Sequence, residues 1–252
     1  MTVTLRSKQL ELDHYNTDKI RNGYLEFYDP ILQPWIEKEI TLLEIGVHEG
    51  GSLMLWQDYF PKGKIVGLDI SLPKGFSPGE RVSLFEGNQA DTKFLSEVAN
   101  NVAPKGFDII IDDASHIGEL TRTTFWYLFD NHLKPGGLYV IEDWFTGYWD
   151  DWPDGKIYSQ KSSDTMKLRR QLLAKLGAFA IKHHLRPPSS LYHFSKIPSQ
   201  SHSYGMVGFV KELVDEQGAA NLTKGCSTNS AKMQSKFENM TITSSIVFIK
   251  KK

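Results

Sequence analysis

The stretch TLLEIGVHEGGSLMLWQDYFPKGKIVGLDI, residues 41–70, decides the fold of this chain. It opens with a short apolar run over 41–47 that is typical of a buried strand. The chain then passes through glycines into a helix over 50–60 and returns to a strand over 64–70. A strand, a helix and a second strand in this order form the repeating unit of a parallel sheet.

The alternation of strands and helices continues beyond this unit. Strands are predicted at 81–87, 107–112 and 137–143, further strand candidates lie at 204–213 and 244–252, and helices are predicted at 91–102 and near 117–131. The predicted fold class is therefore α/β, with a Rossmann-like, doubly wound, mostly parallel seven-stranded sheet and an antiparallel C-terminal strand.

The last third of the chain is less regular. Residues 144–160 break the alternation, 162–183 look helical, and the polar stretch 215–240 is expected to form a loop or a partly helical insert. As an alternative, 237–243 could pair with 246–250 as a final hairpin. We expect a single domain over 1–252, with an N-terminal helical cap (1–40), a cofactor- and metal-binding core (41–143), an acceptor region with an insert (144–240) and a final strand (241–252).

The composition indicates which classes of binding partner the chain is suited to. Lys plus Arg is 29 and Asp plus Glu is 30, a net charge of −1, which argues against a nucleic-acid partner. The only cysteine, Cys226, excludes a disulfide within the chain. The first residues lack the apolar core of a signal peptide, and no apolar run approaches membrane-spanning length. We therefore expect a cytoplasmic protein without a membrane partner. The sequence is compatible with either a monomer or a homo-oligomer.

Polar residues and glycines gather where the first two strands end. Glu44, Gly46 and Gly50 lie on the first strand-to-helix turn, where glycines let the backbone take positive φ and approach a ligand closely. Asp69 ends the second strand, where a carboxylate can accept both hydroxyls of a ribose. The spacing is not G-x-G-x-x-G, so a dinucleotide is disfavoured. A glycine turn beside a solvated acid is the alternative to a nucleoside site.

These motifs resemble those of class I S-adenosylmethionine-dependent methyltransferases. EIGVHEGGS (44–52) looks like their first motif, and EGNQAD (86–91) resembles their adenine-side loop. Together with DHYNTDK (13–19), IDDASH (111–116) and VIEDWFTGYW (140–149), they are similar to the metal-dependent macrolide-sugar O-methyltransferases. With Asp18 also near the cofactor, the predicted cofactor-binding residues are Tyr15, Thr17, Lys19, Glu44, Gly46, His48, Gly50, Ser52, Asp69, Gln89, Asp91 and Asp112.

Acidic residues also follow two later strands. Asp113 comes after the strand 107–112, and Glu142 and Asp143 end the strand 137–143. Neighbouring parallel strands open onto one crevice, so these carboxylates are expected to converge and to repel one another unless a divalent cation such as Mg²⁺ or Mn²⁺ lies between them. His116 can then act as the base that takes a hydroxyl proton. The resemblance assigns the same roles: metal to the three acids and base to His116.

Simpler roles exist for each of these residues. Asp112 and Asp113 could cap the helix predicted near 117–131. Asp91 could cap the helix predicted at 91–102, and His116 could be a packing histidine. We interpret Asp112 as helix-capping or cofactor-side, not as a ligand. Four aromatic residues after the acids could form a wall for the acceptor, or else cover the core or an interface: Trp144, Phe145, Tyr148 and Trp149.

The predicted function is an S-adenosylmethionine- and Mg²⁺-dependent O-methyltransferase that acts on a hydroxyl of a glycosylated small molecule, such as an antibiotic or other natural product. A NAD-dependent oxidoreductase, an Fe²⁺- and 2-oxoglutarate-dependent hydroxylase, a non-catalytic binding protein and a protein or nucleic-acid methyltransferase are the alternatives. Among these, the missing dinucleotide motif weakens the first, and the near-zero net charge weakens the last.

Overall fold

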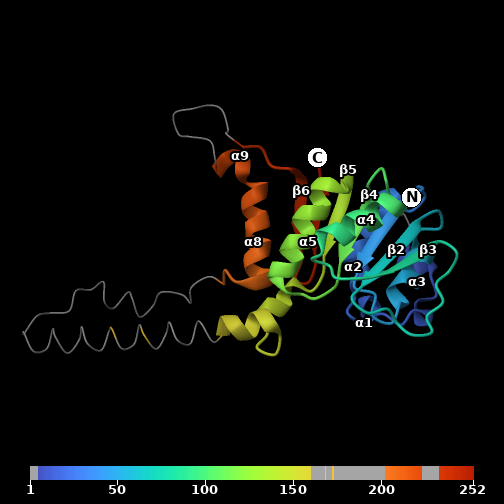
Figure 1. The fold of residues 1–252 in the computed structure, drawn as a ribbon, viewed down its shortest axis with the longest axis horizontal. Helices are drawn as coiled ribbons and strands as arrows, with labels where there is room; N and C mark the ends of the chain where they lie inside the picture. The colour runs from blue at the N-terminus through green and yellow to red at the C-terminus, as the bar shows by residue number, and fades with distance from the viewer. Residues whose placement is uncertain (1–4, 160–167, 169–171, 173–201, 223–232) are drawn as a thin grey trace, which may run out of the picture.

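The computed structural model describes residues 5–159, 168, 172, 202–222 and 233–252. Its centre is a twisted sheet with helices on both faces (Figure 1). The strands are β1 (Thr41–Ile45), β2 (Lys64–Asp69), β3 (Val82–Glu86), β4 (Phe107–Asp112), β5 (Leu133–Ile141), β6 (Phe237–Ile242) and β7 (Val247–Lys251).

The strand order is β3-β2-β1-β4-β5-β7-β6. The strands β1 to β5 are parallel, and β7 runs antiparallel to both of its neighbours. The predicted fold class is thus confirmed. The chain winds outward from β1 to β3 and then crosses back to β4, so β1 and β4 flank the point where the winding direction reverses. Ligands bind outside the carboxyl ends of the strands at such a point.

Helices cover the two faces of the sheet. In the described residues they are α1 (Asp18–Arg21), α2 (Leu25–Leu32), α3 (Gly51–Tyr59), α4 (Thr92–Val102), α5 (Gly118–Asn131), α8 (Gly205–Gln217), α9 (Ala219–Leu222) and a helical stretch over 153–159. Short 3₁₀ helices are η1 (Ser7–Gln9), η2 (Leu12–His14), η3 (Gln33–Trp35) and η4 (Trp144–Tyr148).

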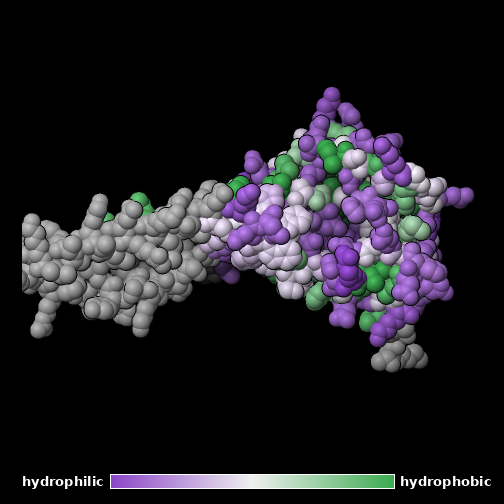
Figure 2. Space-filling view, turned by 90° about the horizontal axis from the view of Figure 1, so that it is seen from below, coloured by the Kyte–Doolittle hydropathy of each residue, from purple (hydrophilic) through white to green (hydrophobic). Residues whose placement is uncertain are grey.

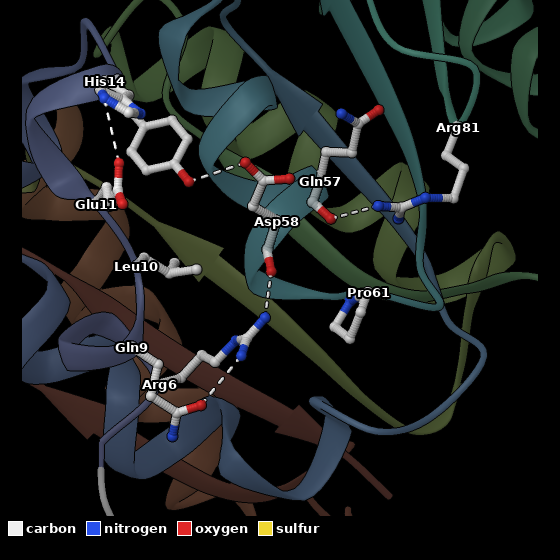
Figure 3. A pocket seen from close by; sticks show the side chains of 10 residues that line it. Arg6, Gln9, Leu10, Glu11, His14, Gln57, Asp58, Pro61 and Arg81 are labelled. Carbon is white, nitrogen blue, oxygen red and sulfur yellow. Dashed lines mark hydrogen bonds and ion pairs between the residues drawn. The ribbon is translucent and has the colours of Figure 1, made fainter.

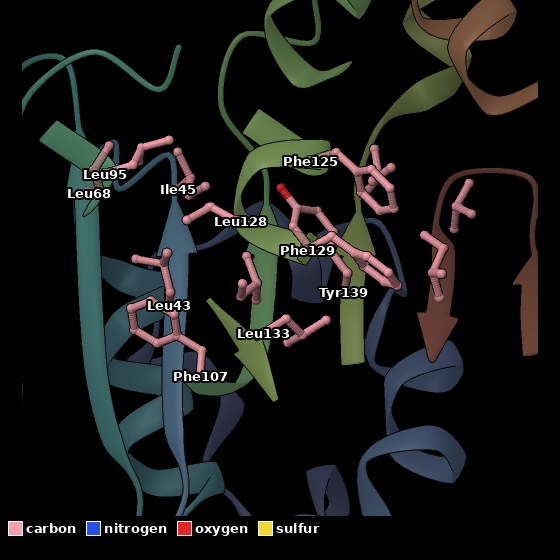
Figure 4. Close-up of a cluster of buried hydrophobic side chains, with 14 of the residues drawn as sticks. Leu43, Ile45, Leu68, Leu95, Phe107, Phe125, Leu128, Phe129, Leu133 and Tyr139 are labelled. Atoms are coloured by element: carbon pink, nitrogen blue, oxygen red, sulfur yellow. The ribbon is translucent and has the colours of Figure 1, made fainter. Parts of the chain in front are cut away.

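The central strands β1, β2, β4 and β5 are apolar on both faces, as a doubly covered sheet requires. Leu43 and Ile45 point into the cluster shared with α4, α5 and α8 (Figure 4), while Leu42 points into the opposite cluster with α2 and α3. Tyr28 of α2 is fully buried in that second cluster. The described part of the N-terminal segment is therefore tied to the sheet through aromatic side chains.

The C-terminal third departs from the sequence prediction at one element. Residues 204–213, predicted as a strand, belong to the helix α8. Its buried side chains Met206, Phe209, Val210 and Leu213 follow the three- and four-residue spacing of a helix face, which β-branched residues and glycines had obscured. The helix packs against α5 and η4.

The final strands form the hairpin left open by the sequence, with Ile242 paired to Val247. The predicted strand 137–143 begins four residues earlier and ends at Ile141, and the predicted strand 244–252 is shorter at both ends. Of the stretch 215–240, residues 215–217 end α8, residues 219–222 form α9, and 237–240 lie in β6. The predicted helix 162–183 lies outside the described residues except at positions 168 and 172.

On the face seen in Figure 2, the described residues are mainly hydrophilic, and apolar side chains occur there in small, scattered groups. None of the helices among the described residues combines the length and the apolar composition that a membrane crossing requires.

Candidate functional site

A cavity of about 820 Å³ opens at the carboxyl ends of the central strands. This volume is within the range of small-molecule sites. The cavity joins the two groups of residues singled out from the sequence, the glycine turn after β1 and the acidic segments after β4 and β5. Nine of the predicted site residues line it: Thr17, Gly46, His48, Ser52, Asp69, Gln89, Asp113, His116 and Asp143.

The glycine turn has the predicted positive φ angles, at +97° for Gly46 and +87° for Gly50. The close approaches that require glycine are made by the protein itself. A Cβ on Gly46 would lie 2.0 Å from the carbonyl oxygen of Asp113, and one on Gly51 would lie 1.9 Å from that of Asn16. Gly46 therefore also lets the segment that follows β4 pack closely against the turn.

Asp69 organises this turn. Its Oδ2 accepts hydrogen bonds from the backbone N–H groups of Val47 at 2.6 Å and His48 at 3.0 Å, and its Oδ1 accepts one from Ser71 at 3.1 Å. A carboxylate oxygen can accept two hydrogen bonds, so Oδ1, which accepts only that of Ser71, retains acceptor capacity at the cavity wall. This arrangement fits the predicted contact with ribose hydroxyls.

Glu44 lies beneath the turn and is not among the residues that line the cavity. Ser52 Oγ donates to its Oε2 at 2.7 Å and Trp56 Nε1 donates to its Oε1 at 3.0 Å. Burial raises the pKa of Glu44. The structure therefore places Glu44 as a buried support for the turn, and its cofactor contact stays a prediction.

Asp112 is fully buried behind the cavity, and burial raises its pKa to about 7. Gln89 Nε2 donates to its Oδ1 at 3.4 Å, and Tyr139 Oη donates to its Oδ2 at 3.3 Å. It does not cap α5. That role belongs to Asp154, whose Oδ2 accepts from the backbone N–H of Gly118 at 2.7 Å. The capping alternative for Asp112 was thus wrong, and its cofactor contact stays a prediction.

Two of the predicted cofactor residues are helix caps. Asp91 accepts hydrogen bonds from the backbone N–H groups of Lys93 and Phe94 at 3.0 and 3.1 Å and does not line the cavity. Thr17 accepts from the backbone N–H of Lys19 at 3.4 Å and also lines the cavity. For Asp91 the capping alternative is confirmed, and a cofactor contact stays a prediction.

Tyr15 lies in a second groove, of about 450 Å³, which is lined by Arg6, Asp58 and Arg81 among others (Figure 3). Its hydroxyl donates to Asp58 Oδ2 at 2.9 Å. Burial and the neighbouring Asp58 raise the pKa of Tyr15 to about 12. The structure therefore separates Tyr15 from the other predicted cofactor residues.

The acidic end of the cavity brings Asp113, His116 and Asp143 together. One ligand atom from each lies within 4.8 Å of the other two. His116 Nε2 is 3.8 Å from Asp113 Oδ1 and 3.9 Å from Asp143 Oδ2, too far for hydrogen bonds. The three groups thus converge without satisfying one another.

Lys19 is buried under this cluster, with only 1% of its side chain exposed. Its Nζ lies 2.6 Å from Asp113 Oδ2, 3.0 Å from Glu142 Oε1 and 3.3 Å from Glu44 Oε1. Burial alone would lower the pKa of Lys19, but the three carboxylates outweigh it and hold that pKa well above its usual value. Lys19 is not among the residues that line the cavity, and its predicted cofactor contact stays a prediction. Lys19 is a fixed cation below the cavity.

Glu142 is also buried. Its Oε1 accepts from Lys19 and from Tyr28 Oη, whereas its Oε2 has no hydrogen-bond partner among the described residues. Burial and the charge of Asp113 raise its pKa, against the opposing effect of Lys19. Burial also raises the pKa of Asp143. Glu142 lies outside the group of converging ligand atoms, so its role as a metal ligand stays a prediction.

The backbone is strained at this site. Among the described residues, the non-glycine residues with positive φ are His48, His116 and Asp143, at +48°, +51° and +52°. All three line the cavity. Such conformations cost roughly 1–3 kcal/mol each and cluster at functional sites.

The aromatic segment after β5 does not form the cavity wall that was one of its two predicted roles. None of Trp144, Phe145, Tyr148 and Trp149 lines the cavity. Trp144 Nε1 donates to the carbonyl of Thr243 at 3.1 Å, and Tyr148 and Trp149 are about half exposed. The core-covering alternative is thus confirmed for Trp144.

Trp152, which sequence reasoning did not select, does line the cavity. Its ring meets the His116 ring edge-on at 5.3 Å between centroids. The signal was its place at the end of the tryptophan-rich segment, directly before the helical stretch 153–159.

No family model matches the chain. Mycinamicin VI 2''-O-methyltransferase of Micromonospora griseorubida is 35% identical over 201 residues, 76% of this chain and 48% of that protein. Demethylmacrocin O-methyltransferase of Streptomyces fradiae is 44% identical over 129 residues, 48% of this chain and 32% of that protein. The chain thus spans half or less of the length of these curated relatives.

Among solved structures, the MycE methyltransferase of the mycinamycin biosynthetic pathway, in complex with Mg and SAH, aligns with a TM-score of 0.61 and 27% identity. The alignment covers 90% of this chain and 49% of that one. The chain is therefore a homologue of the macrolide-sugar O-methyltransferases and has the class I methyltransferase fold.

Proposed function

We propose that this chain carries the catalytic part of an S-adenosylmethionine-dependent, Mg²⁺-dependent O-methyltransferase. One observation supports this most strongly: a single cavity joins the Asp69-anchored glycine turn to the cluster of Asp113, His116 and Asp143. The first part suits a nucleoside and the second a cation. An enzyme that transfers a methyl group to a cation-bound hydroxyl needs both within reach of each other.

The residues present fit a small divalent cation. Asp113 and Asp143 converge at the cavity, and Glu142 Oε2 is a buried oxygen without a partner among the described residues. An unpaired buried carboxylate oxygen is costly, and a cation removes that cost. These three carboxylates would hold the ion, which when bound acts as a Lewis acid that makes the acceptor hydroxyl easier to deprotonate.

His116 supplies the base in this proposal. Its Nε2 lies between Asp113 Oδ1 and Asp143 Oδ2, at 3.8 and 3.9 Å. A hydroxyl held at the two acids would therefore lie close to an imidazole nitrogen that can take its proton. The Trp152 ring packs edge-on against the imidazole and supports its orientation. Bound S-adenosylmethionine supplies the methyl group.

The ligand set also separates this proposal from the hydroxylase alternative. Fe²⁺ oxygenases that use 2-oxoglutarate hold iron with two histidines and one carboxylate. Here a single histidine, His116, accompanies carboxylates. A set dominated by oxygen favours Mg²⁺ or Mn²⁺. No described residue supplies the second histidine in this cluster.

The acceptor is proposed to be a hydroxyl on the sugar of a glycosylated small molecule. The curated relatives, named as mycinamicin, demethylmacrocin, oleandolide and tetracenomycin O-methyltransferases, support this class. The Trp152 ring at the cavity also supports it, because aromatic faces pack well against sugar rings.

The test is methyl transfer from radiolabelled S-adenosylmethionine to a panel of glycosylated macrolides, run with Mg²⁺ and with excess EDTA. We expect transfer to at least one glycoside with Mg²⁺ and none in EDTA. The matching aglycones serve as controls and should not be methylated. Transfer that is unchanged in EDTA would overturn the metal-dependent mechanism.

A further inference from the structure

The three carboxylates proposed to hold the cation share a bonding pattern: a protein donor occupies one oxygen of each. Lys19 Nζ lies 2.6 Å from Asp113 Oδ2. Glu142 Oε1 accepts from Tyr28 Oη and lies 3.0 Å from Lys19 Nζ. Asp143 Oδ1 accepts from Tyr24 Oη.

The second oxygen of each carboxylate has no hydrogen-bond donor among the described residues. Glu142 Oε2 is buried without a partner. Asp113 Oδ1 and Asp143 Oδ2 are approached only by His116 Nε2, at 3.8 and 3.9 Å. Each acid therefore has one oxygen that is held and one that is available.

The donors are held firmly by the core. Lys19, Tyr24 and Tyr28 are at most 3% exposed. The Tyr28 ring packs edge-on against Trp56 at 5.1 Å and against Phe248 at 5.4 Å. These residues belong to the N-terminal segment, which reaches the acids from nearly a hundred or more positions away in the sequence. The pattern is thus imposed by tertiary packing.

The number of available oxygens bears on which cation fits. Ca²⁺ takes six to eight oxygens and often binds both oxygens of one carboxylate, whereas Mg²⁺ takes six in a near-ideal octahedron and rarely does so. Three carboxylates that each offer one oxygen supply half of an octahedron. The other positions are left for water and acceptor oxygens.

We propose that Lys19, Tyr24 and Tyr28 are positioning residues that restrict Asp113, Glu142 and Asp143 to one oxygen each, and that they thereby select Mg²⁺ over Ca²⁺. This inference rests on the proposed function, because it takes the same three acids as the cation ligands. It goes further by assigning the cation selectivity to residues that do not touch the cation.

The test measures binding, not turnover. Affinities for Mg²⁺ and Ca²⁺ are determined by calorimetry, and by displacement of Mn²⁺ followed by electron paramagnetic resonance, in the full chain and in Tyr24→Phe. Removing the Tyr24 hydroxyl frees Asp143 Oδ1. We expect the ratio of Mg²⁺ to Ca²⁺ affinity to fall about fivefold or more, because Asp143 can then offer both of its oxygens, which Ca²⁺ accepts more readily than Mg²⁺ does.

Tyr15→Phe is the matched control, because it also removes a tyrosine hydroxyl from a carboxylate, Asp58, but in the separate groove. Its cation ratio should stay at the wild-type value. Tyr28→Phe, which frees Glu142 Oε1 from one of its two donors, should shift the ratio in the same direction as Tyr24→Phe. Circular dichroism and thermal midpoints verify that each variant is folded.

An unchanged ratio in both Tyr24→Phe and Tyr28→Phe, with Mg²⁺ still bound, would overturn the positioning role and leave the proposed function intact. A wild-type chain that binds neither cation, yet binds S-adenosylhomocysteine, would overturn both the positioning role and the metal-dependent mechanism. A ratio that falls equally in Tyr15→Phe would also contradict the proposal.

Discussion

The two ends of the cavity differ in how their carboxylates are satisfied. At the glycine-turn end, both oxygens of Asp69 accept backbone hydrogen bonds, from Val47, His48 and Ser71. At the acidic end, Glu142 Oε2 has no partner among the described residues. The protein itself thus completes the first end, whereas the second end leaves a buried oxygen for the proposed cation.

This difference predicts that the two ends of the cavity have separate functions. Because the turn around Asp69 is formed by backbone hydrogen bonds, the cofactor end should bind its ligand whether or not a cation is present. The acidic end should control the chemistry instead. Substitutions at the two ends should therefore change different quantities: cofactor affinity at the first, and cation affinity or turnover at the second.

The largest effect is expected at Asp113. Asp113→Asn keeps the size of the side chain but removes a negative charge from the cluster with His116 and Asp143. Methyl transfer should fall about a thousandfold or more, because a lost Lewis acid forfeits several kcal/mol of transition-state stabilisation. Turnover with radiolabelled cofactor gives the rate, and calorimetry should find S-adenosylhomocysteine affinity nearly unchanged. Full activity in this variant would contradict the metal role.

His116→Gln should have the next largest effect. Glutamine keeps a polar side chain at the cavity but cannot accept and release the hydroxyl proton as imidazole does. The turnover number should fall about 10²–10³-fold, the range of general base catalysis, with the Mg²⁺ affinity within a few-fold of the wild type. A parallel loss of Mg²⁺ affinity would instead show that His116 is a cation ligand, and would contradict its assignment as base.

A smaller effect, on cofactor affinity and not on cation affinity, is expected at the glycine-turn end. Asp69→Asn weakens the acceptor that holds the turn and faces the cavity. Affinity for S-adenosylhomocysteine should fall about tenfold, equivalent to roughly 1.4 kcal/mol. The Mg²⁺ affinity, measured by Mn²⁺ displacement, should not change. If Asp69→Asn lowered Mg²⁺ affinity as strongly as cofactor affinity, the two ends would not be separate.

The smallest effect is expected for Asp91→Ala. Asp91 accepts from the first N–H groups of α4 (Thr92–Val102) and stays outside the cavity lining. Losing an N-cap should lower the free energy of unfolding by about 1 kcal/mol, which denaturant titration can measure. Cofactor affinity should remain at the wild-type value. A several-fold weaker affinity would support the cofactor contact that the sequence motif had indicated.

The sequence alone predicted those parts of the fold and of the site that follow from the order of strands and turns along the chain. Apolar runs and glycines located β1, β2 and β4, and parallel strands open their carboxyl ends on one side. Asp69, Asp113 and Asp143 could therefore be assigned to one cavity from sequence order alone. The hairpin of β6 and β7 was available only as an alternative, because the short strands there carry no signal that decides their pairing.

The remaining features of the site depend on contacts between residues that are far apart in the sequence. The resemblance placed Lys19 at the cofactor, but the fold buries it between one acid in β1 and two that follow β4 and β5. Asp154 caps α5 from 36 positions away, although Asp112 and Asp113 were nearer in sequence. The helix α8 was mistaken for a strand because its β-branched residues outweighed its helical spacing in a short window.

The claim that the cofactor end is complete without the cation can be tested most directly by calorimetry. S-adenosylhomocysteine is titrated into the full chain, first with saturating Mg²⁺ and then with excess EDTA. The two dissociation constants should agree within about threefold. Binding that appears only with Mg²⁺, or binding in neither condition, would contradict this account of the two ends.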